Sequence, residues 1–70
     1  MEKYIKDVCE KFNLTFVEKK DKKFSWPEVT FKGEYDDLVK YLKYYNGGHC
    51  TQDDIDLYIK DNSITVDVAI

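Results

Sequence analysis

The hydrophobic pattern of this 70-residue chain changes its period three times, and those changes limit the folds open to it. Residues 2–13 place their apolar side chains at helical spacing, and residues 14–31 then alternate as strands do. Residues 34–46 return to helical spacing, and residues 51–70 alternate again. The pattern predicts the order α-β-β-α-β-β in a single small α+β domain over residues 1–70.

The first two strands are expected to form a hairpin closed by a polar turn at residues 19–22. Phe24 and Trp26 continue the alternation after this turn, but the apolar residues beyond Pro27 fall on the opposite parity. A bulge or bend at Pro27 would reconcile the two halves of that strand. Because proline donates no ladder hydrogen bond, the sequence also favours an edge position for this strand.

Residues 51–60 allow two interpretations. Thr51 and the acidic residues that follow it resemble the start of a helix. Apolar residues at every second position instead favour a strand, which a turn at residues 61–62 would join to the last strand. The pairs expected from that turn are Ile59 with Ile64, Leu57 with Val66 and Ile55 with Val68. We favour this hairpin, which gives an antiparallel four-stranded sheet with two helices on one face; three strands and three helices form the alternative.

Size limits the stability that such a fold can reach, since cores below about 70–80 residues rarely supply more than about 3–5 kcal/mol. Cys9 and Cys50 allow one disulfide at most, and in a reducing compartment both are expected to be free thiols. Dense packing of the aromatic residues or association would have to supply the remaining stability. A homodimer and an obligate partner are both expected forms of such association.

Composition narrows the classes of protein further. No apolar run approaches the roughly 20 residues of a membrane span, and no signal peptide follows Met1, so we expect a cytoplasmic protein. All eleven basic residues are lysine, a usage typical of an AT-rich coding sequence. A phage or another mobile element is one expected source of such a sequence, and the location would then be the host cytoplasm. Without arginine, the chain lacks the planar guanidinium that reads guanine edges and clamps phosphate.

The segment that most resembles a reaction centre is Asn46–Cys50, where His49 and Cys50 could be a base with its nucleophile or two metal ligands. Adjacent residues of an extended chain point in opposite directions, so His49 cannot readily activate Cys50. A zinc site would also need Cys9 and a carboxylate to reach four ligands. We therefore expect no catalytic residue, no metal and no cofactor, and a protein that is not an enzyme.

Charge is unevenly distributed along the chain. Residues 1–33 contain eight lysines and six acidic residues, a net +2, whereas residues 34–70 contain three lysines and eight acidic residues, a net −5. Carboxylates on the outer side of the last hairpin could contact a basic groove on a partner protein. Tyrosines whose hydroxyl is in solvent while the ring is partly buried are favoured anchors at protein interfaces. The residues predicted to bind a partner are Tyr41, Tyr44, Tyr58, Asp53, Asp54, Asp56 and Asp67.

These observations predict a small protein-interaction module that occupies the surface of a partner protein as an inhibitor or modulator. A nucleic-acid-processing or defence protein with a basic groove is one expected kind of partner. The alternative function is binding of single-stranded nucleic acid by a basic-aromatic cluster. That cluster comprises Lys19, Lys20, Lys22, Lys23, Phe24 and Trp26. The more ordinary interpretation of the same segment is a solvated turn beside core aromatic residues.

Overall fold

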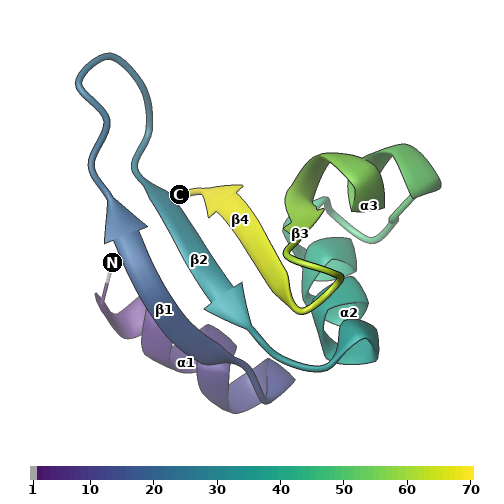
Figure 1. The fold of residues 1–70 in the computed structure, drawn as a ribbon. Coiled ribbons are helices and arrows are strands. Elements are labelled where there is room, and N and C mark those ends of the chain that lie inside the picture. The colour runs from purple at the N-terminus through teal and green to yellow at the C-terminus, as the bar shows by residue number, and fades with distance from the viewer. Residues whose placement is uncertain (1) are drawn as a thin grey trace.

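The structure, a computed structural model, describes residues 2–70 and contains a four-stranded antiparallel sheet with the strand order β1-β2-β4-β3 (Figure 1). Two of its helices, α1 and α2, cover one face of this sheet, as the sequence predicts. A third helix, α3, lies beside the short edge strand β3. The elements are α1 (Glu2–Phe12), β1 (Thr15–Lys20), β2 (Glu28–Lys32), α2 (Tyr35–Tyr45), α3 (Gln52–Tyr58), β3 (Ile59–Lys60) and β4 (Thr65–Ala69).

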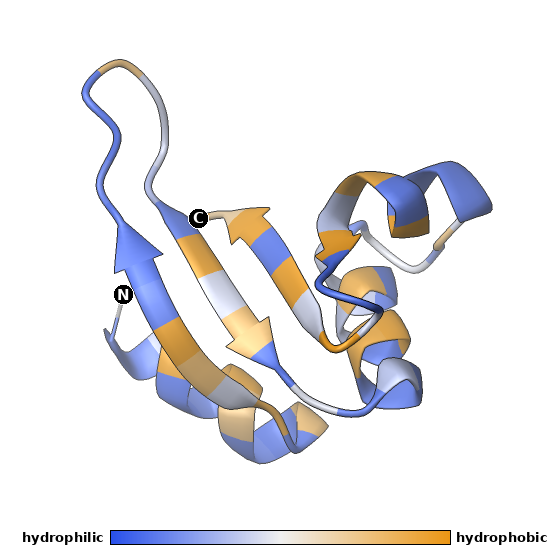
Figure 2. Cartoon of the chain, in the orientation of Figure 1, coloured by the Kyte–Doolittle hydropathy of each residue, from blue (hydrophilic) through white to orange (hydrophobic). Residues whose placement is uncertain are grey.

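The core lies between the sheet and the two helices. In the two central strands Val29 pairs with Val68 and Phe31 pairs with Val66, and all four side chains are buried. Because side chains alternate across a strand, the intervening residues point to the uncovered face, and Figure 2 shows the resulting bands of apolar and polar residues along β2 and β4. The helices contribute the other large buried side chains, among them Leu38 and Leu42 of α2 and Val8 of α1.

The sequence also predicts where α2 ends. The helix stops at Tyr45, and Asn46 is its C-terminal cap. Gly47 and Gly48 then take positive φ values of 78° and 115°, a region in which glycine has no steric penalty. The expected stop signal is therefore confirmed by the backbone.

The expected strand over residues 51–58 is wrong, because this segment forms α3. Thr51 begins the helix with a capping box, in which the Asp54 amide donates to the Thr51 hydroxyl (3.2 Å) and the Thr51 amide donates to the Asp54 carboxylate (3.0 Å). Only Ile59 and Lys60 continue as a strand, so the sheet keeps its four strands.

The pairing of β3 with β4 also differs from the expected register. Ile59 pairs with Val66 rather than with Ile64, because the connection between the strands is longer than two residues. Its first three residues, Asp61, Asn62 and Ser63, all have positive φ values, between 53° and 70°. Two of the three are residue types that tolerate this left-handed region comparatively well.

The capping box of α3 leads to a prediction about acid. The hydrogen bonds from Thr51 hold the pKa of the Asp54 carboxyl below its ordinary value. A carboxylate with a lowered folded pKa stabilises the folded state above its unfolded pKa, and this contribution is lost as the pH falls through the folded pKa. We expect amide protection in α3 to fall in that acid range while β2 and β4 stay protected, and hydrogen exchange followed by NMR would measure it. Uniform loss of protection across the chain would contradict this prediction.

The first hairpin differs from expectation in two ways. β2 is a central strand, paired with both β1 and β4, so the edge position expected for it is wrong. Phe24 and Trp26 lie outside the sheet, because β2 begins only at Glu28. The register instead shifts within β1, between Phe16 and Glu18, so the irregularity lies on the opposite strand. Pro27 uses its carbonyl oxygen to accept a hydrogen bond from the amide of Ile70 (2.9 Å), which joins the base of the loop to the end of β4.

Candidate interaction surface

Tyr41 belongs to the core and not to an interaction surface, which corrects its predicted role in partner binding. Its side chain has no solvent exposure, and its ring lies 5.5 Å from that of Phe12 and 5.3 Å from that of Phe31. The Tyr41 hydroxyl is hydrogen-bonded to the Tyr4 hydroxyl at 3.0 Å. Burial, together with this hydrogen bond, raises the pKa of Tyr41 far above its ordinary value.

The other two predicted tyrosines lie in different environments. Tyr44 is half-exposed on the side of α2 that meets α1, where its ring contacts Phe12 and the Lys11 ammonium lies 4.6 Å from the ring centre. Tyr58 is half-buried at the end of α3, with its ring packed edge-on against that of Tyr45. Tyr58 therefore helps to attach α3 to α2, whereas Tyr44 remains available to solvent.

The predicted aspartates divide between two elements. Asp53 and Asp56 are exposed on α3, and Asp54 beside them is engaged in the capping box. Asp67 instead lies on the uncovered face of the sheet, where its carboxylate accepts a hydrogen bond of 2.6 Å from the Thr30 hydroxyl. The structure thus brings the three α3 aspartates together and separates Asp67 from them by placing it on a central strand.

The most exposed large apolar side chains of residues 2–70 lie in the loop between β1 and β2, which projects beyond the sheet (Figure 1). Phe24 is 93% exposed and Trp26 is 75% exposed. The interpretation of these rings as core aromatics is therefore wrong. Residues 24–26 alternate between apolar and polar, but three residues are too few to establish a strand. The only sign of a loop in the sequence is the neighbouring Pro27.

Most of the lysines in and next to this loop form ion pairs with acidic residues. Three exposed ion pairs join Lys19 to Asp21 (3.4 Å), Lys20 to Glu18 (3.2 Å) and Lys22 to Glu28 (3.5 Å). The fourth lysine, Lys23, lies with its ammonium 5.4 Å from the Phe24 ring centre. Residues 18–28 contain four lysines and three acidic residues, so the net charge of the segment is +1.

His49 and Cys50 lie in the connection between α2 and α3. His49 is exposed, while Cys50 is partly buried and its thiol points at the carbonyl oxygen of Thr51, 3.9 Å away. Burial raises the pKa of Cys50 and also that of Cys9, so both free thiols favour the protonated form. Within residues 2–70, no cluster of three or more histidine, cysteine or acidic side chains is placed to hold a metal ion.

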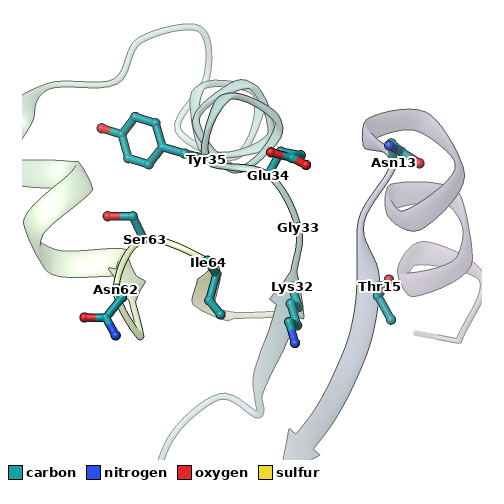
Figure 3. A pocket seen from close by; sticks show the side chains of 9 residues that line it. All are labelled: Asn13, Thr15, Lys32, Gly33, Glu34, Tyr35, Asn62, Ser63 and Ile64. Carbon is teal, nitrogen blue, oxygen red and sulfur yellow. The ribbon is translucent and has the colours of Figure 1, made fainter.

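An open cleft of about 630 Å³ lies where the ends of α1 and β2 meet the start of α2 and the β3–β4 connection (Figure 3). Its side chains do not converge on a common point: Tyr35 and Lys32 extend in different directions, and Asn62 points outward. Two of the lining residues are joined by a hydrogen bond of 3.0 Å, from the Gly33 amide to the Ile64 carbonyl oxygen.

None of the helices in residues 2–70 has the length and apolar character needed to cross a bilayer. Three comparisons were made for the whole chain, against protein-family models, curated proteins and solved structures. None of the three gives a match.

Proposed function

We propose that this protein is a small non-enzymatic interaction module that docks on a partner protein through the loop formed by residues 21–27. Phe24 and Trp26 are the anchors in this proposal, and their exposure is the observation that carries it. Aromatic side chains bury large areas at interfaces and are enriched among the residues that dominate binding energy. Each ring would gain about 2–3 kcal/mol on transfer from water to an apolar pocket.

The position of the loop supports the same proposal. It projects from the end of the sheet, so the two rings can enter a concave site without a collision between the sheet and the partner. Its base is held by the ladder between β1 and β2 and by the hydrogen bond from Ile70 to Pro27. A module that fills a pocket in this way acts as an inhibitor or modulator of its partner. Both thiols are free, which fits a reducing compartment such as the cytoplasm.

The charges around the loop favour a protein over a single-stranded nucleic acid as the partner. Binding to a phosphate backbone draws its affinity from several lysines that neutralise phosphates. Three of the four lysines here already face carboxylates, and the net charge of residues 18–28 is only +1. The exposed rings could stack on bases, but the electrostatic groove that normally accompanies such stacking is weak.

A pair of variants tests the role of the loop. Affinity capture from the natural host would first supply the partner, whose dissociation constant is then measured with purified components. We expect the double variant Phe24→Ser, Trp26→Ser to bind at least about 100-fold more weakly, because each ring is a central anchor. Its unfolding midpoint should not change, since both side chains are exposed.

The matched control is the double variant Tyr44→Ser, Leu57→Ser, which removes two half-exposed apolar side chains on α2 and α3. It should bind the partner with unchanged affinity. A partner that binds the loop variant normally and the control weakly would contradict the proposal and would restore the α2 and α3 surface as the contact site.

The nucleic-acid alternative has a direct test, because Trp26 is the only tryptophan of the chain. We expect its fluorescence to stay constant when a single-stranded oligonucleotide is added at low salt. Quenching that is reversed by salt would favour the alternative over a protein partner.

A further inference from the structure

An apolar groove of about 390 Å³ lies between α1 and β1, at the outer edge of the sheet. Ile5, Cys9 and Phe16 form its apolar walls. Phe16 pairs with Phe31 in the sheet, so its side chain lies on the helix-covered face, yet it remains 42% exposed. Apolar surface that stays accessible at the edge of a fold is typical of an interaction site.

The aromatic loop, residues 21–27, begins at one end of this groove. Lys19 lines the groove, and β1 ends at the next residue, Lys20. Within one chain the loop projects away from the sheet, and its two rings, Phe24 and Trp26, are exposed (Figure 1). The chain therefore carries exposed aromatic rings and an open apolar groove next to each other, and neither covers the other.

The aromatic loop is long enough to fill the groove of a second copy. Phe24 is the central residue of the loop, four residues from the nearest residue of either strand, so it can lie up to about 13 Å beyond the sheet. The groove follows β1 from Phe16 to Lys19, a length of about 10 Å. Because the loop and the groove share one end of the molecule, two copies that face each other by this end can each insert the loop into the groove of the other. Such a reciprocal contact has two-fold symmetry and closes at two copies.

The area that this contact buries is sufficient for a stable dimer. An aromatic side chain buries about 150–250 Å². Phe24 and Trp26 of two copies would therefore bury about 600–1,000 Å² of exposed aromatic surface, and the groove walls that receive them would lose a comparable area. The total of about 1,200–2,000 Å² is the range of specific, stable protein interfaces.

The charges on the two surfaces are compatible with this contact. Glu2, Lys6 and Lys19 border the groove. Lys23 of the loop has its ammonium over an aromatic ring, and it could contact Glu2 of the other copy. Asp21 forms an exposed ion pair with Lys19 that exchanges readily, and it could contact Lys6. The loop thus offers one charge of each sign, and the border of the groove has a partner for both.

We propose that two copies of this chain form a symmetric dimer in which the aromatic loop of each copy occupies the groove between α1 and β1 of the other. Phe24 and Trp26 contact Ile5, Cys9 and Phe16 across the interface. The inference rests on the proposed function in one respect: the same two rings are the anchors for the partner, so the partner and a second copy compete for the loop. The dimer is the form in which the anchors are covered.

Sedimentation velocity of the purified full chain tests the dimer. We expect the sedimenting mass to rise from one chain at low micromolar concentration to two chains near millimolar concentration. The variant Phe24→Ser, Trp26→Ser should stay a monomer over this range, whereas Tyr44→Ser, Leu57→Ser should dimerise as the unaltered chain does. Well below the dissociation constant of the dimer the rings are exposed, and unfolding midpoints of single chains are compared there.

A second pair of variants tests the groove. Phe16→Glu places a charge on the groove wall and should weaken the dimer at least about 100-fold, because a dimer contains two such contacts. The matched control is Val17→Glu, which makes the same change at the next residue, 48% exposed and outside the groove lining, and should change the dissociation constant less than about threefold. Circular dichroism establishes that both variants are folded.

Cys9 gives a measurement that does not depend on the folding of a groove variant. In the variant Cys50→Ser, Cys9 is the remaining thiol of the chain. We expect its reaction with a thiol reagent to slow as the protein concentration rises, because the second copy covers the groove. The same chain with Phe24→Ser and Trp26→Ser should react at one rate at all concentrations.

NMR of mixed samples identifies the contact. In an equal mixture of ¹³C-labelled and unlabelled chains, we expect nuclear Overhauser effects between the Ile5 methyl groups of one copy and the Trp26 ring of the other. The same effects found within one copy would show that the loop closes over its own groove, which would overturn the inference.

Three results from sedimentation would also overturn it. A chain that stays monomeric near millimolar concentration would exclude the dimer. A dimer that Phe24→Ser, Trp26→Ser also forms would be held by another surface. Growth beyond two copies would exclude a reciprocal contact.

The partner separates this inference from the proposed function. Phe16→Glu should lose the dimer and still bind the partner at least as tightly as the unaltered chain does, because the partner contacts the loop. If the chain is monomeric but Phe24→Ser, Trp26→Ser loses the partner, the inference fails and the proposed function stands. If the dimer forms as described but that loop variant binds the partner normally, the proposed function fails and the dimer stands.

Discussion

Replacing Tyr41 with alanine should unfold the chain at 25 °C, whereas the same change at Tyr44 should leave it folded. The Tyr41 ring has no exposure and packs against Phe12 and Phe31, so its removal opens a cavity in the centre of the core. Truncation of a buried aromatic residue to alanine costs about 3–5 kcal/mol, which matches the whole stability that a core of this size supplies. Tyr44 is 52% exposed, and its truncation should cost about 1 kcal/mol.

Urea unfolding followed by far-ultraviolet circular dichroism would measure both variants against the unaltered chain. Tyr41→Phe is the control, because it keeps the ring and removes only the hydroxyl that meets Tyr4. Loss of that hydrogen bond should cost about 1 kcal/mol. If Tyr41→Ala unfolds at the same urea concentration as Tyr44→Ala, then Tyr41 does not have the central packing role described above.

The second large effect should appear at high pH. Burial and the Tyr4 hydroxyl raise the pKa of Tyr41, so the folded chain holds its phenol proton at a pH where the unfolded chain has lost it. The stabilisation is therefore complete below the unfolded pKa of about 10 and falls as the pH rises toward the folded pKa. Each pH unit in that window should lower the free energy of unfolding by about 1.4 kcal/mol for Tyr41 alone.

We expect the chain to unfold only above about pH 12, since a core of this size supplies at most about 3–5 kcal/mol and the loss begins near pH 10. Tyr41→Phe should be less stable than the unaltered chain at pH 7 but more stable at pH 12, so the two stability curves should cross. Tyr44→Phe, which alters a half-exposed ring, should follow the unaltered chain throughout. Urea midpoints measured from pH 7 to 12 would show this, and parallel curves for Tyr41→Phe and the unaltered chain would contradict it.

The elements that sequence alone predicts correctly are those whose signals are local. The helical period of α1 and α2, and the glycines after Asn46, act within a few residues and need no knowledge of distant contacts. The segment 52–58 carried two competing local signals. The capping box at Thr51 provides hydrogen-bond partners for backbone groups within one helical turn. A strand would instead have to pair along all of β4. In the structure only Thr65 and Val66 of β4 pair with β3.

The candidate surface was harder to predict because exposure depends on how elements pack. Tyr41 falls at the border of the apolar face of α2, and it is buried because α1 and the sheet close over it from two sides. Phe24 and Trp26 are residue types that are usually buried, yet they lie in an exposed loop, because Pro27 follows them and β2 begins only at Glu28. Distinguishing these cases requires the tertiary contacts, which periodicity does not encode.

The position of β4 has a consequence for how the chain folds. Thr65–Ala69 is the last of the described elements in order, yet it is one of the two central strands; it joins β2 to β3 and contributes the buried Val66 and Val68. Until β4 joins the sheet, β2 has an open edge beside Phe31. Such an uncovered edge is the kind of surface that chaperones recognise and that aggregates. Partly folded states that lack β4 should therefore be the states of this chain most prone to aggregation.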